Sequence, residues 1–398
     1  MNYIELFIPI FALAIGFELL LNYRRGEKFY RVNDTINSIS LGTLSTTSKL
    51  VLINIGALVY AWIQTTFDVA VWESVNWWMW GLAFIGYDFC YYWLHRMGHE
   101  RKILWAAHVA HHQSEEYNLS TALRQTSCGF LLGWIFYIPC FLLGMPTELF
   151  VTVGSLNLIY QFWVHTRFVP ELGPLEYLLV SPSNHRVHHA RNKEYIDKNY
   201  GGVFILWDRI FGTYKREQAD VPVDFGITRG LNSWNPLWAN THVYWEMFKD
   251  SLKTKRWSDK VRIWVGRTDY LPADIVKAPA EPGNAYNPPM LTAMRNYVLV
   301  QFFVLMVLGT LIKTIDPTQG QWQVPAVFIY LASALVSLGW LMEGRALWLE
   351  YLRLVAAPAL AWLIYPDQML WFGGYSLVSL MSLIWLSRKA PEPEGAAA

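Results

Sequence analysis

Nine of the ten histidines in this chain fall into closely spaced groups. One group is an HxxxH pair, two are HxxHH triplets, and one is a QxxxH pair. Residues three or four apart share one face of a helix, with roughly 5–6 Å between their Cβ atoms. The HxxxH and HxxHH groups can therefore each offer several imidazoles to one metal ion, and the QxxxH pair offers one. The groups are His95 and His99; His108, His111 and His112; Gln161 and His165; His185, His188 and His189.

The number and type of these side chains predict a centre with two metal ions. Neutral imidazole is a common ligand for zinc, copper and iron, and eight or nine histidines exceed what one ion coordinates. A structural zinc site would more often use cysteines, and a hydrolytic metal pair would add bridging carboxylates, which these motifs lack. The pattern therefore favours a redox-active pair that activates dioxygen. A transporter or metal-storage protein is the alternative class, but the apolar segments contain few of the polar residues that it would need.

The elements that must position these histidines are predicted to be membrane helices. The chain is 54% hydrophobic and only 16% charged. A helix that crosses a bilayer needs about 20 mostly apolar residues. We expect an all-α, polytopic membrane protein with about nine spans and a cytosolic, histidine-rich cap that holds two metals. The segments are 3–22, 40–64, 74–94, 128–144, 147–164, 297–315, 323–342, 346–364 and 368–386. The fourth and fifth are short, so a helical hairpin that does not fully cross is the competing interpretation.

The distribution of basic residues predicts the orientation. Cytoplasmic loops carry an excess of Lys and Arg. On that side we place Arg24, Arg25, Lys28 and Arg31, then Arg96, Arg101, Lys102 and Arg124, and finally Arg388 and Lys389. The histidine groups then face the cytoplasm, from either a bacterial inner membrane or the endoplasmic reticulum, with the N-terminus on the opposite side. The first segment is interpreted as a retained helix rather than a signal peptide. Arg353 is expected to extend from the end of its span to the membrane surface.

Five regions follow from this layout. Residues 1–74 form N-terminal transmembrane helices, 75–215 the catalytic region with the histidine motifs, and 216–296 a cytosolic insert and connector. Residues 297–387 form C-terminal transmembrane helices, and the tail 388–398 is expected to be disordered. Net charge is only +1, and no basic stripe or nucleic-acid-binding motif occurs, so no nucleic-acid partner is expected. His242 lies outside every motif and is expected at the surface.

The order HxxxH, HxxHH, QxxxH, HxxHH resembles that of the fatty acid hydroxylase superfamily, the membrane di-iron enzymes that include sterol desaturases. Several blocks are similar to those of its alkylglycerol monooxygenase branch, strongly over residues 75–215. They are "YYWLHRMGHE", "AAHVAHHQSEEYNLSTALRQ", "IYQFWVHT", "LGPLEYLLVSPSNHRVHHARN" and "YIDKNYGGVFILWDRIFGTY". The resemblance implies that the nine histidines hold two iron ions. It also implies that Glu100, directly after the HxxxH pair, orients an imidazole or helps to hold a pterin. A solvated charge beside Arg101 is the alternative for Glu100.

Further polar residues are expected to support the metal ligands. Gln161 occupies a position that is histidine in some members of the superfamily, so its amide either binds metal or hydrogen-bonds a ligand. Asn184 is a further candidate for this supporting role. Carboxylates that fix the orientation of metal-bound imidazoles are expected from Asp88, Asp197 and Asp208. Asp88 is the strongest of the three, because it lies two helical turns before His95 in an apolar span. Asp208 has a local alternative, a pair with Arg209.

The reaction implied by the resemblance is an oxygen-dependent oxidation of a lipid C–H bond. In the alkylglycerol branch the oxidised carbon lies next to an ether oxygen, so the ether is cleaved to a fatty aldehyde and a glycerol derivative. Tetrahydrobiopterin supplies the electrons there. Hydroxylation or desaturation of a sterol or fatty acyl chain, with a redox protein as partner, is the alternative within the superfamily. The chain itself has no cytochrome signature or dinucleotide fingerprint, so either reaction needs an external reductant.

Overall fold

The computed structural model describes residues 3–52, 55–277, 285–311, 322–364, 366 and 369–388. Within these residues the chain is helical and has no strand, only three isolated bridges between loops. The predicted all-α fold is thus confirmed for this part of the chain. The predicted tail falls outside it except for Arg388, and so do residues 278–284 of the connector and residues 312–315 of the sixth predicted span.

Contacts divide the chain into two compact units. The first contains Met1–Gly42, Ile53–Leu231 and Asn240–Asn284; the second contains Thr43–Leu52, Asn232–Ala239 and Ala285–Ala398. The helices with at least nine residues that contribute to the first unit are α1 (Ile4–Arg25), α2 (Val32–Val51), α3 (Ile55–Thr66), α4 (Trp77–Glu100), α10 (Thr147–Trp163), α13 (Pro236–Lys253) and α14 (Trp257–Val265). The domain boundaries predicted from the sequence stay predictions.

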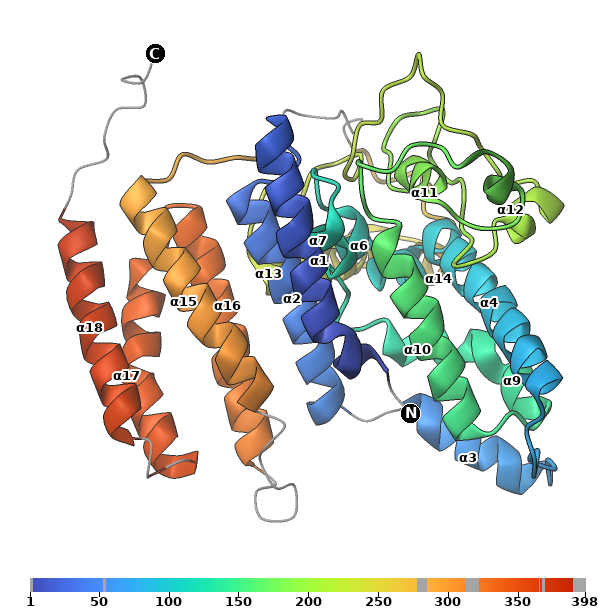
Figure 1. Cartoon of the computed structure of the whole chain (residues 1–398), viewed down its shortest axis with the longest axis horizontal. Coiled ribbons are helices and arrows are strands. Elements are labelled where there is room, and N and C mark those ends of the chain that lie inside the picture. Colours follow the sequence, from blue (N-terminus) through green and yellow to red (C-terminus); the bar gives the residue numbers. More distant parts are fainter. Residues whose placement is uncertain are drawn as a thin grey trace. The chain divides into compact units, whose positions relative to one another are not determined.

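The long helices α4 and α10 pack against each other, and α1 packs on α10 (Figure 1). Short elements follow α4: α5 (Lys102–Ala106), α6 (Val109–His112), α7 (Leu119–Ala122), α8 (Phe130–Gly133), a 3₁₀ turn at Trp134–Tyr137, and α9 (Ile138–Leu142). After α10 come a second 3₁₀ turn (Gly173–Tyr177), α11 (Pro182–His188) and α12 (Leu206–Ile210). Loops with α11 and α12 cover the end of α4 that carries His95 and His99 (Figure 1). The cap over the histidines is therefore mainly loop and short helix.

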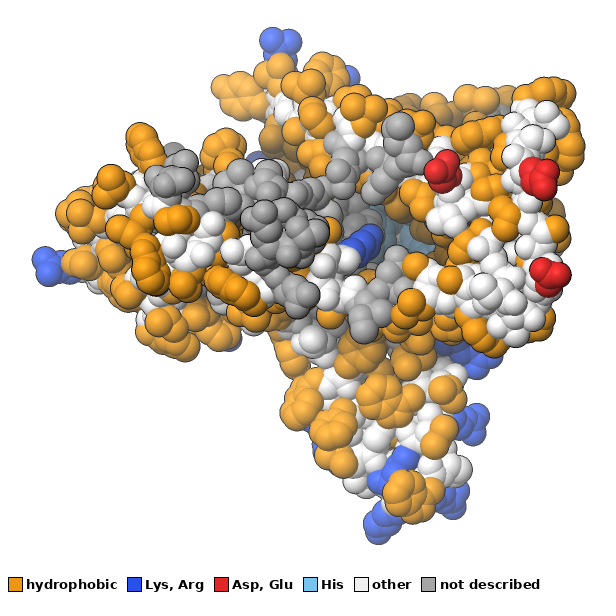
Figure 2. Space-filling model, turned by 90° about the horizontal axis from the view of Figure 1, so that it is seen from below, with side chains coloured by type: hydrophobic (Ala, Val, Ile, Leu, Met, Phe, Trp, Pro, Cys, Tyr) orange, Lys and Arg blue, Asp and Glu red, His pale blue; other side chains and the backbone are white. Residues whose placement is uncertain are grey.

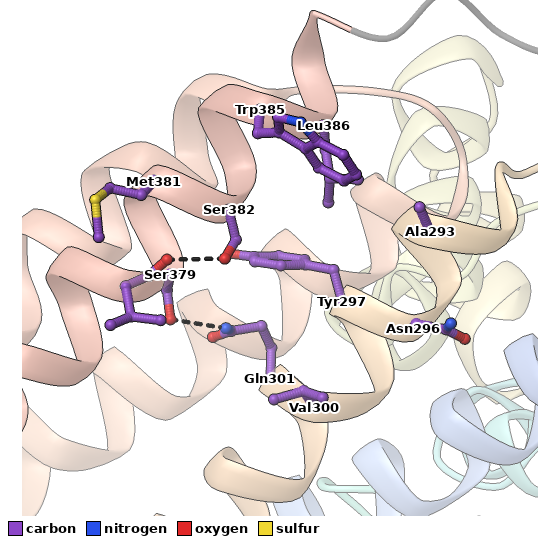
Figure 3. A pocket seen from close by; sticks show the side chains of 11 residues that line it. Ala293, Asn296, Tyr297, Val300, Gln301, Ser379, Met381, Ser382, Trp385 and Leu386 are labelled. Atoms are coloured by element: carbon purple, nitrogen blue, oxygen red, sulfur yellow. Dashed lines mark hydrogen bonds between the residues drawn. The ribbon is translucent and has the colours of Figure 1, made fainter.

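The second unit is built mainly from four apolar helices. They are α15 (Thr292–Leu311), α16 (Gln323–Met342), α17 (Leu347–Ile364) and α18 (Met369–Ser387). A cavity of about 620 Å³ lies between α15 and α18, and Tyr297, Gln301 and Ser379 are among its lining residues (Figure 3). The Gln301 amide donates to Ser379 Oγ across it at 2.9 Å.

Arg353 contradicts its sequence-based prediction. Its guanidinium does not reach the surface but is buried inside the second unit, where it donates to Glu350 Oε1 at 2.5 Å and Oε2 at 2.9 Å. Glu350 also accepts from the hydroxyls of Tyr297 and Ser337, each at 2.7 Å. A buried charge pair is tolerated when its remaining hydrogen-bonding atoms are satisfied, and these neighbours satisfy them. The sequence-based prediction left out Glu350, an opposite charge one helical turn before Arg353.

The prediction of about nine spans is not confirmed. By length and composition, five described helices can cross a membrane: Leu6–Arg25, Thr292–Thr310, Gln323–Met342, Leu347–Ile364 and Met369–Ser387. The pair α2 and α3 makes a sixth if it counts as one bent span. Segment 128–144 is broken into α8, a 3₁₀ turn and α9, and α10 has only 17 residues. The alternative of a short hairpin is compatible with these two segments.

Candidate metal centre

The structure brings nine histidines together in two groups. His95, His99, His108, His112 and His188 form one group, and His111, His165, His185 and His189 form the other. Within each group the nearest ring nitrogens all lie within 4.8 Å of one another. All nine are the histidines singled out from the sequence. The two triplets are divided between the groups, so each triplet serves both.

Different elements deliver these side chains to one place. His95 and His99 lie on the last turns of α4, whereas His111 and His112 lie on the four-residue helix α6. His165 follows the end of α10, and α11 supplies the second triplet. α11 begins at a capping box in which Ser181 and Asn184 bond each other's backbone, with Pro182 as its first residue. Such a box, with proline at the first helical position, stabilises the start of a short helix. Asn184 therefore sets where α11 begins.

Backbone carbonyls orient several of the imidazoles. Nδ1 of His95 lies 2.8 Å from the Tyr200 carbonyl oxygen, and Nδ1 of His111 lies 2.8 Å from that of Arg124. Nδ1 of His165 lies 2.8 Å from the Gln161 carbonyl oxygen. Nδ1 of His188 lies 3.0 Å from the Lys198 carbonyl oxygen. A carbonyl can only accept, so each Nδ1 carries the proton and each Nε2 holds a free lone pair.

The inward-facing nitrogens are arranged as metal ligands rather than as hydrogen-bonding partners. In the first group Nε2 of His95, His99 and His188 is buried and has no hydrogen-bond partner. In the second group His165 Nε2 lies 3.1 Å from His185 Nε2 and 3.4 Å from His111 Nε2. Because Nδ1 of both His165 and His111 donates to a carbonyl, neither Nε2 of that pair has a proton to share. Buried polar atoms without partners are costly, and a cation bound between them would remove that cost.

Burial also keeps these imidazoles in the form that binds metals. It lowers the pKa of His95 to about 3 and that of His111 to about 4. Burial likewise moves the pKa of His99, His108 and His165 well below the usual value. At neutral pH these rings are uncharged, so their lone pairs are available without loss of a proton. The residues therefore fit a pair of metal ions.

Asp88 does not touch a histidine, although the sequence placed it beside His95. Its carboxylate accepts four hydrogen bonds, from Asn157 Nδ2 at 2.6 Å, Trp207 Nε1 at 3.0 Å, and the backbone amides of Val203 and Phe204 at 2.9 and 3.1 Å. Asp88 thereby fastens the loop that follows Tyr200 to α4 and α10. Asp88 can therefore influence the orientation of the His95 ring only indirectly, by holding the loop that carries the Tyr200 carbonyl.

Asp208 holds the same loop from the other side. Its carboxylate accepts from the backbone amides of Tyr200 and Gly201, each at 2.7 Å, and from Thr213 Oγ1 at 2.6 Å. The alternative for Asp208, a local pair with Arg209, does not form; the Arg209 guanidinium donates to the Glu176 carbonyl instead. Burial raises the pKa of Asp208 to about 6. Asp208 is linked to His95 through Tyr200, whose backbone amide donates to Asp208 and whose carbonyl accepts from His95.

We expect Asp208→Asn to weaken metal binding without unfolding the protein. An asparagine offers one accepting oxygen where the carboxylate offers two, so one loop amide loses its acceptor and the Tyr200 carbonyl shifts relative to His95. Removing such a supporting group costs about 10- to 100-fold in metal affinity. Iron retained during titration with a chelator measures the effect. Asp220→Asn, an exposed acidic residue on a nearby loop, serves as the control and should leave retention unchanged.

Gly202 allows this loop to approach α4 closely. A Cβ at this position would lie 2.7 Å from Tyr91 Cδ1 and 2.9 Å from Asp88 Oδ1. We expect Gly202→Ala to lower the free energy of unfolding by about 1–3 kcal/mol, the usual cost of overpacking. Thermal unfolding in detergent is the measurement. Gly86→Ala in α4 is the matched control: its Cβ would meet no atom within 4 Å, so stability should be unchanged or slightly higher.

The remaining predicted residues have these surroundings. The Gln161 amide accepts from Tyr91 Oη at 2.7 Å and donates to Asn157 Oδ1 at 2.6 Å, so its oxygen and nitrogen both have protein partners. This arrangement favours the supporting role over metal ligation. Glu100 pairs with Arg96 at 2.8 Å rather than with an imidazole or Arg101. Asp197 Oδ1 lies 3.8 Å from His99 Nδ1 and is the carboxylate of the three nearest to a histidine ring.

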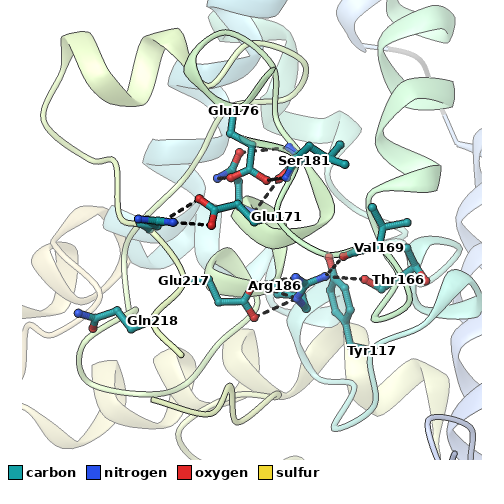
Figure 4. A network of polar contacts seen from close by, with 12 residues as sticks. Tyr117, Thr166, Val169, Glu171, Glu176, Ser181, Arg186, Glu217 and Gln218 are labelled. Carbon is teal, nitrogen blue, oxygen red and sulfur yellow. Dashed lines mark hydrogen bonds and ion pairs between the residues drawn. The ribbon is translucent and has the colours of Figure 1, made fainter. Parts of the chain in front are cut away.

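Arg186 and Arg124 were missed from the sequence. Arg186, inside the second triplet, pairs with Glu217 at 2.7 Å and donates to the carbonyls of Thr166 and Val169, so it ties α11 to the segment after His165 (Figure 4). Arg124 is buried, and its guanidinium donates to the Ala110 carbonyl while its own carbonyl accepts from His111. The only sequence signal for these two roles is a basic residue in or near a histidine motif. A basic residue at the protein surface would look the same in the sequence.

His242 also differs from its prediction. It is buried rather than exposed, and its Nδ1 lies 3.5 Å from Gln113 Nε2. It belongs to neither histidine group. Because His242 stands apart from every histidine motif, its burial could not be expected from the sequence.

The face of the molecule opposite α11 and α12 is hollowed, and histidine side chains are visible in the depth of the hollow (Figure 2). Most side chains on this face are hydrophobic (Figure 2). The other end of the centre is covered by the loops that contain Tyr200 and Lys198. The hollow thus leads from this largely apolar face toward the histidines, most of which are themselves buried.

Comparisons with known proteins agree with the site. A sequence profile of the fatty acid hydroxylase family matches residues 80–213, the stretch that contains all nine histidines. The chain belongs to the fatty acid hydroxylase family. Over 89% of its length it is 37% identical to an alkylglycerol monooxygenase of Danio rerio, of which it covers 81%.

Two further relatives extend the comparison. An alkylglycerol monooxygenase of Homo sapiens is 35% identical over 86% of this chain and 78% of that protein. An ornithine lipid hydroxylase of Rhizobium tropici is 27% identical over 56% of this chain and 70% of that protein. No solved structure matches.

Proposed function

We propose that the protein is a membrane-embedded lipid monooxygenase that hydroxylates a C–H bond, with an alkylglycerol ether lipid as substrate. The observation that carries the proposal is the pair of histidine groups, in each of which the ring nitrogens converge within 4.8 Å, and in the first of which Nε2 of His95, His99 and His188 is buried without a hydrogen-bond partner. The similarity to two alkylglycerol monooxygenases over most of the chain supports the choice of lipid.

The nine histidines would hold two iron ions, which supply dioxygen activation when bound. The chain's own contribution is geometric. Carbonyls of Tyr200, Arg124 and Lys198 fix the rings, and burial keeps them neutral. The loops of the cap exclude water from one side, and the apolar hollow admits a lipid chain from the other. Exclusion of water limits side reactions of the activated oxygen.

The reaction balances with an external reductant. One oxygen atom of dioxygen enters the C–H bond next to the ether oxygen, and the other leaves as water with two electrons and two protons. The hydroxylated carbon is a hemiacetal, which collapses to a fatty aldehyde and a free glycerol hydroxyl. We propose tetrahydrobiopterin as the electron donor and the cytoplasmic face of the membrane, bacterial inner membrane or endoplasmic reticulum, as the location.

A second candidate is hydroxylation or desaturation of another lipid, a sterol or fatty acyl chain, with a redox protein as donor. The similarity to an ornithine lipid hydroxylase supports this second candidate, because the name of that relative indicates a lipid other than an alkylglycerol as its substrate.

Purified protein supplied with ferrous iron separates the two candidates. With dioxygen, tetrahydrobiopterin and an alkylglycerol, the first predicts release of fatty aldehyde. Ester-linked monoacylglycerol of the same chain length is the matched control and should give no aldehyde. Turnover of a sterol or fatty acyl lipid with ferredoxin or cytochrome b5, and none with the pterin, would favour the second. No oxidation under either condition, by protein that retains iron, would contradict both.

A further inference from the structure

Helices α13 and α14 carry large apolar residues that the described part of the chain leaves exposed. On α14 the exposed residues Trp257, Val261 and Val265 are spaced by four, so they form one stripe. Their side chains are 81%, 62% and 56% exposed. On α13 a second stripe contains Trp245, Phe248 and Leu252, and the rings of Trp245 and Phe248 stack at 5.5 Å.

The opposite sides of both helices are packed, so the stripes are not a sign of loose structure. Met247 on α13 and Ile263 on α14 are buried in one cluster with Ala106 and Ile275. Trp264 Nε1 donates to Ser251 Oγ at 2.9 Å and joins the two helices. α14 also packs on α5. Each stripe therefore lies on a helix that is packed in place, and we name the six residues together the α13–α14 face: Trp245, Phe248, Leu252, Trp257, Val261 and Val265.

Charge around the α13–α14 face is unbalanced. Residues 245–265 contain six basic and three acidic residues. All three acidic residues are engaged by the protein: Glu246 and Asp250 pair with Lys277 at 3.8 and 2.5 Å, and Asp259 accepts from Tyr270 Oη at 2.9 Å. Lys253, Lys255 and Arg256 are exposed at the corner between the helices, beside Leu252 and Trp257.

We propose that the α13–α14 face lies on the surface of a bilayer that contains anionic lipid. Apolar stripes with tryptophan at their edge and flanking Lys and Arg are the features of helices that rest in the headgroup layer. Basic side chains next to the membrane are attracted to anionic headgroups, and the corner between α13 and α14 concentrates them. This contact is additional to the spanning helices and does not depend on which lipid the metal centre oxidises.

Spin labels test the contact in the full-length protein. Cysteines at Val261 and Val265 are labelled one at a time, with a label at the exposed loop residue Asp220 as the matched control. The protein is reconstituted into vesicles of phosphatidylcholine, with or without phosphatidylglycerol. Collision with oxygen reports apolar surroundings, and collision with a water-soluble nickel complex reports water. Unsubstituted protein gives the background from its native cysteines. Iron content confirms that each labelled variant is folded.

The expected result is a several-fold higher ratio of oxygen to nickel collisions at positions 261 and 265 than at 220. Adding phosphatidylglycerol should raise that ratio further. In a variant with Lys253→Glu, Lys255→Glu and Arg256→Glu this increase should vanish, while glutamine at the same positions should reduce it less. Water-like collisions at 261 and 265 in both vesicle types would overturn the proposal. Close pairs of labels in distance measurements would overturn it too, because a second copy of the chain would then cover the face.

Discussion

Replacing His185 by alanine is expected to abolish oxygenase turnover and to lower bound iron from two ions per chain to one. His185 Nε2 lies 3.1 Å from His165 Nε2 and 3.2 Å from His189 Nε2, at the middle of the four-histidine group. Its loss leaves three ligands and a space open to water. The five-histidine group retains all its members, so one ion should remain. Metal analysis of purified protein, together with the aldehyde assay, measures both effects.

The matched control is His242→Ala. His242 is buried like the others but belongs to neither histidine group, so this variant tests loss of a buried imidazole without loss of a ligand. It should keep two ions and most of its activity. If His185→Ala kept both ions and full turnover, or if His242→Ala lost as much iron, the assignment of ligands would be wrong.

The second large effect is expected from Asp88→Ala. The substitution leaves four donors without their acceptor: Asn157 Nδ2, Trp207 Nε1 and the amides of Val203 and Phe204. Each buried donor left unpaired costs about 1–3 kcal/mol, and partial relaxation makes a total of roughly 3–5 kcal/mol reasonable. Iron should be lost as well, because the loop that follows Tyr200 is no longer fastened and the Tyr200 carbonyl is then not held against His95.

Thermal unfolding in detergent and iron content measure this prediction. Glu73→Ala removes an exposed carboxylate from the same unit and should leave both unchanged. An Asp88→Ala protein with an unaltered melting temperature would show that the four hydrogen bonds contribute little. Loss of iron at unaltered stability would instead indicate a direct role of Asp88 at the metals.

The histidines could be predicted because a metal centre needs one side-chain type at helical spacing. Their partners could not, because His95, His111 and His188 are oriented by backbone carbonyls, which every residue carries. The role of Asp88 was misplaced for a related reason. Helical spacing put it near His95, but three of its four hydrogen-bond donors come from residues more than a hundred positions later.

Membrane helices were predictable only where apolar length is unambiguous. The four helices of the second unit lie within about five residues of the predicted segments. Segment 128–144 is equally apolar, yet it folds into short pieces around Pro139. Composition does not show where such a segment breaks, because the position of the break depends on how its short helices pack against α3 and α4. Arg353 shows the same limit in part: Glu350 is one turn away on the same helix, but Gln301, which also accepts from the guanidinium, comes from α15 and meets it only in the folded bundle.

The hollow in the apolar face has a consequence for how the enzyme should be studied. If substrate reaches the histidines from within the bilayer, the concentration that governs the rate is the mole fraction of substrate among the surrounding lipids. Diluting the substrate with inert phospholipid should then slow turnover even when its total amount in the cuvette is constant. Diluting the vesicles with buffer should not. Long-chain compounds that partition into lipid would compete strongly, whereas water-soluble analogues with the same head group would compete weakly.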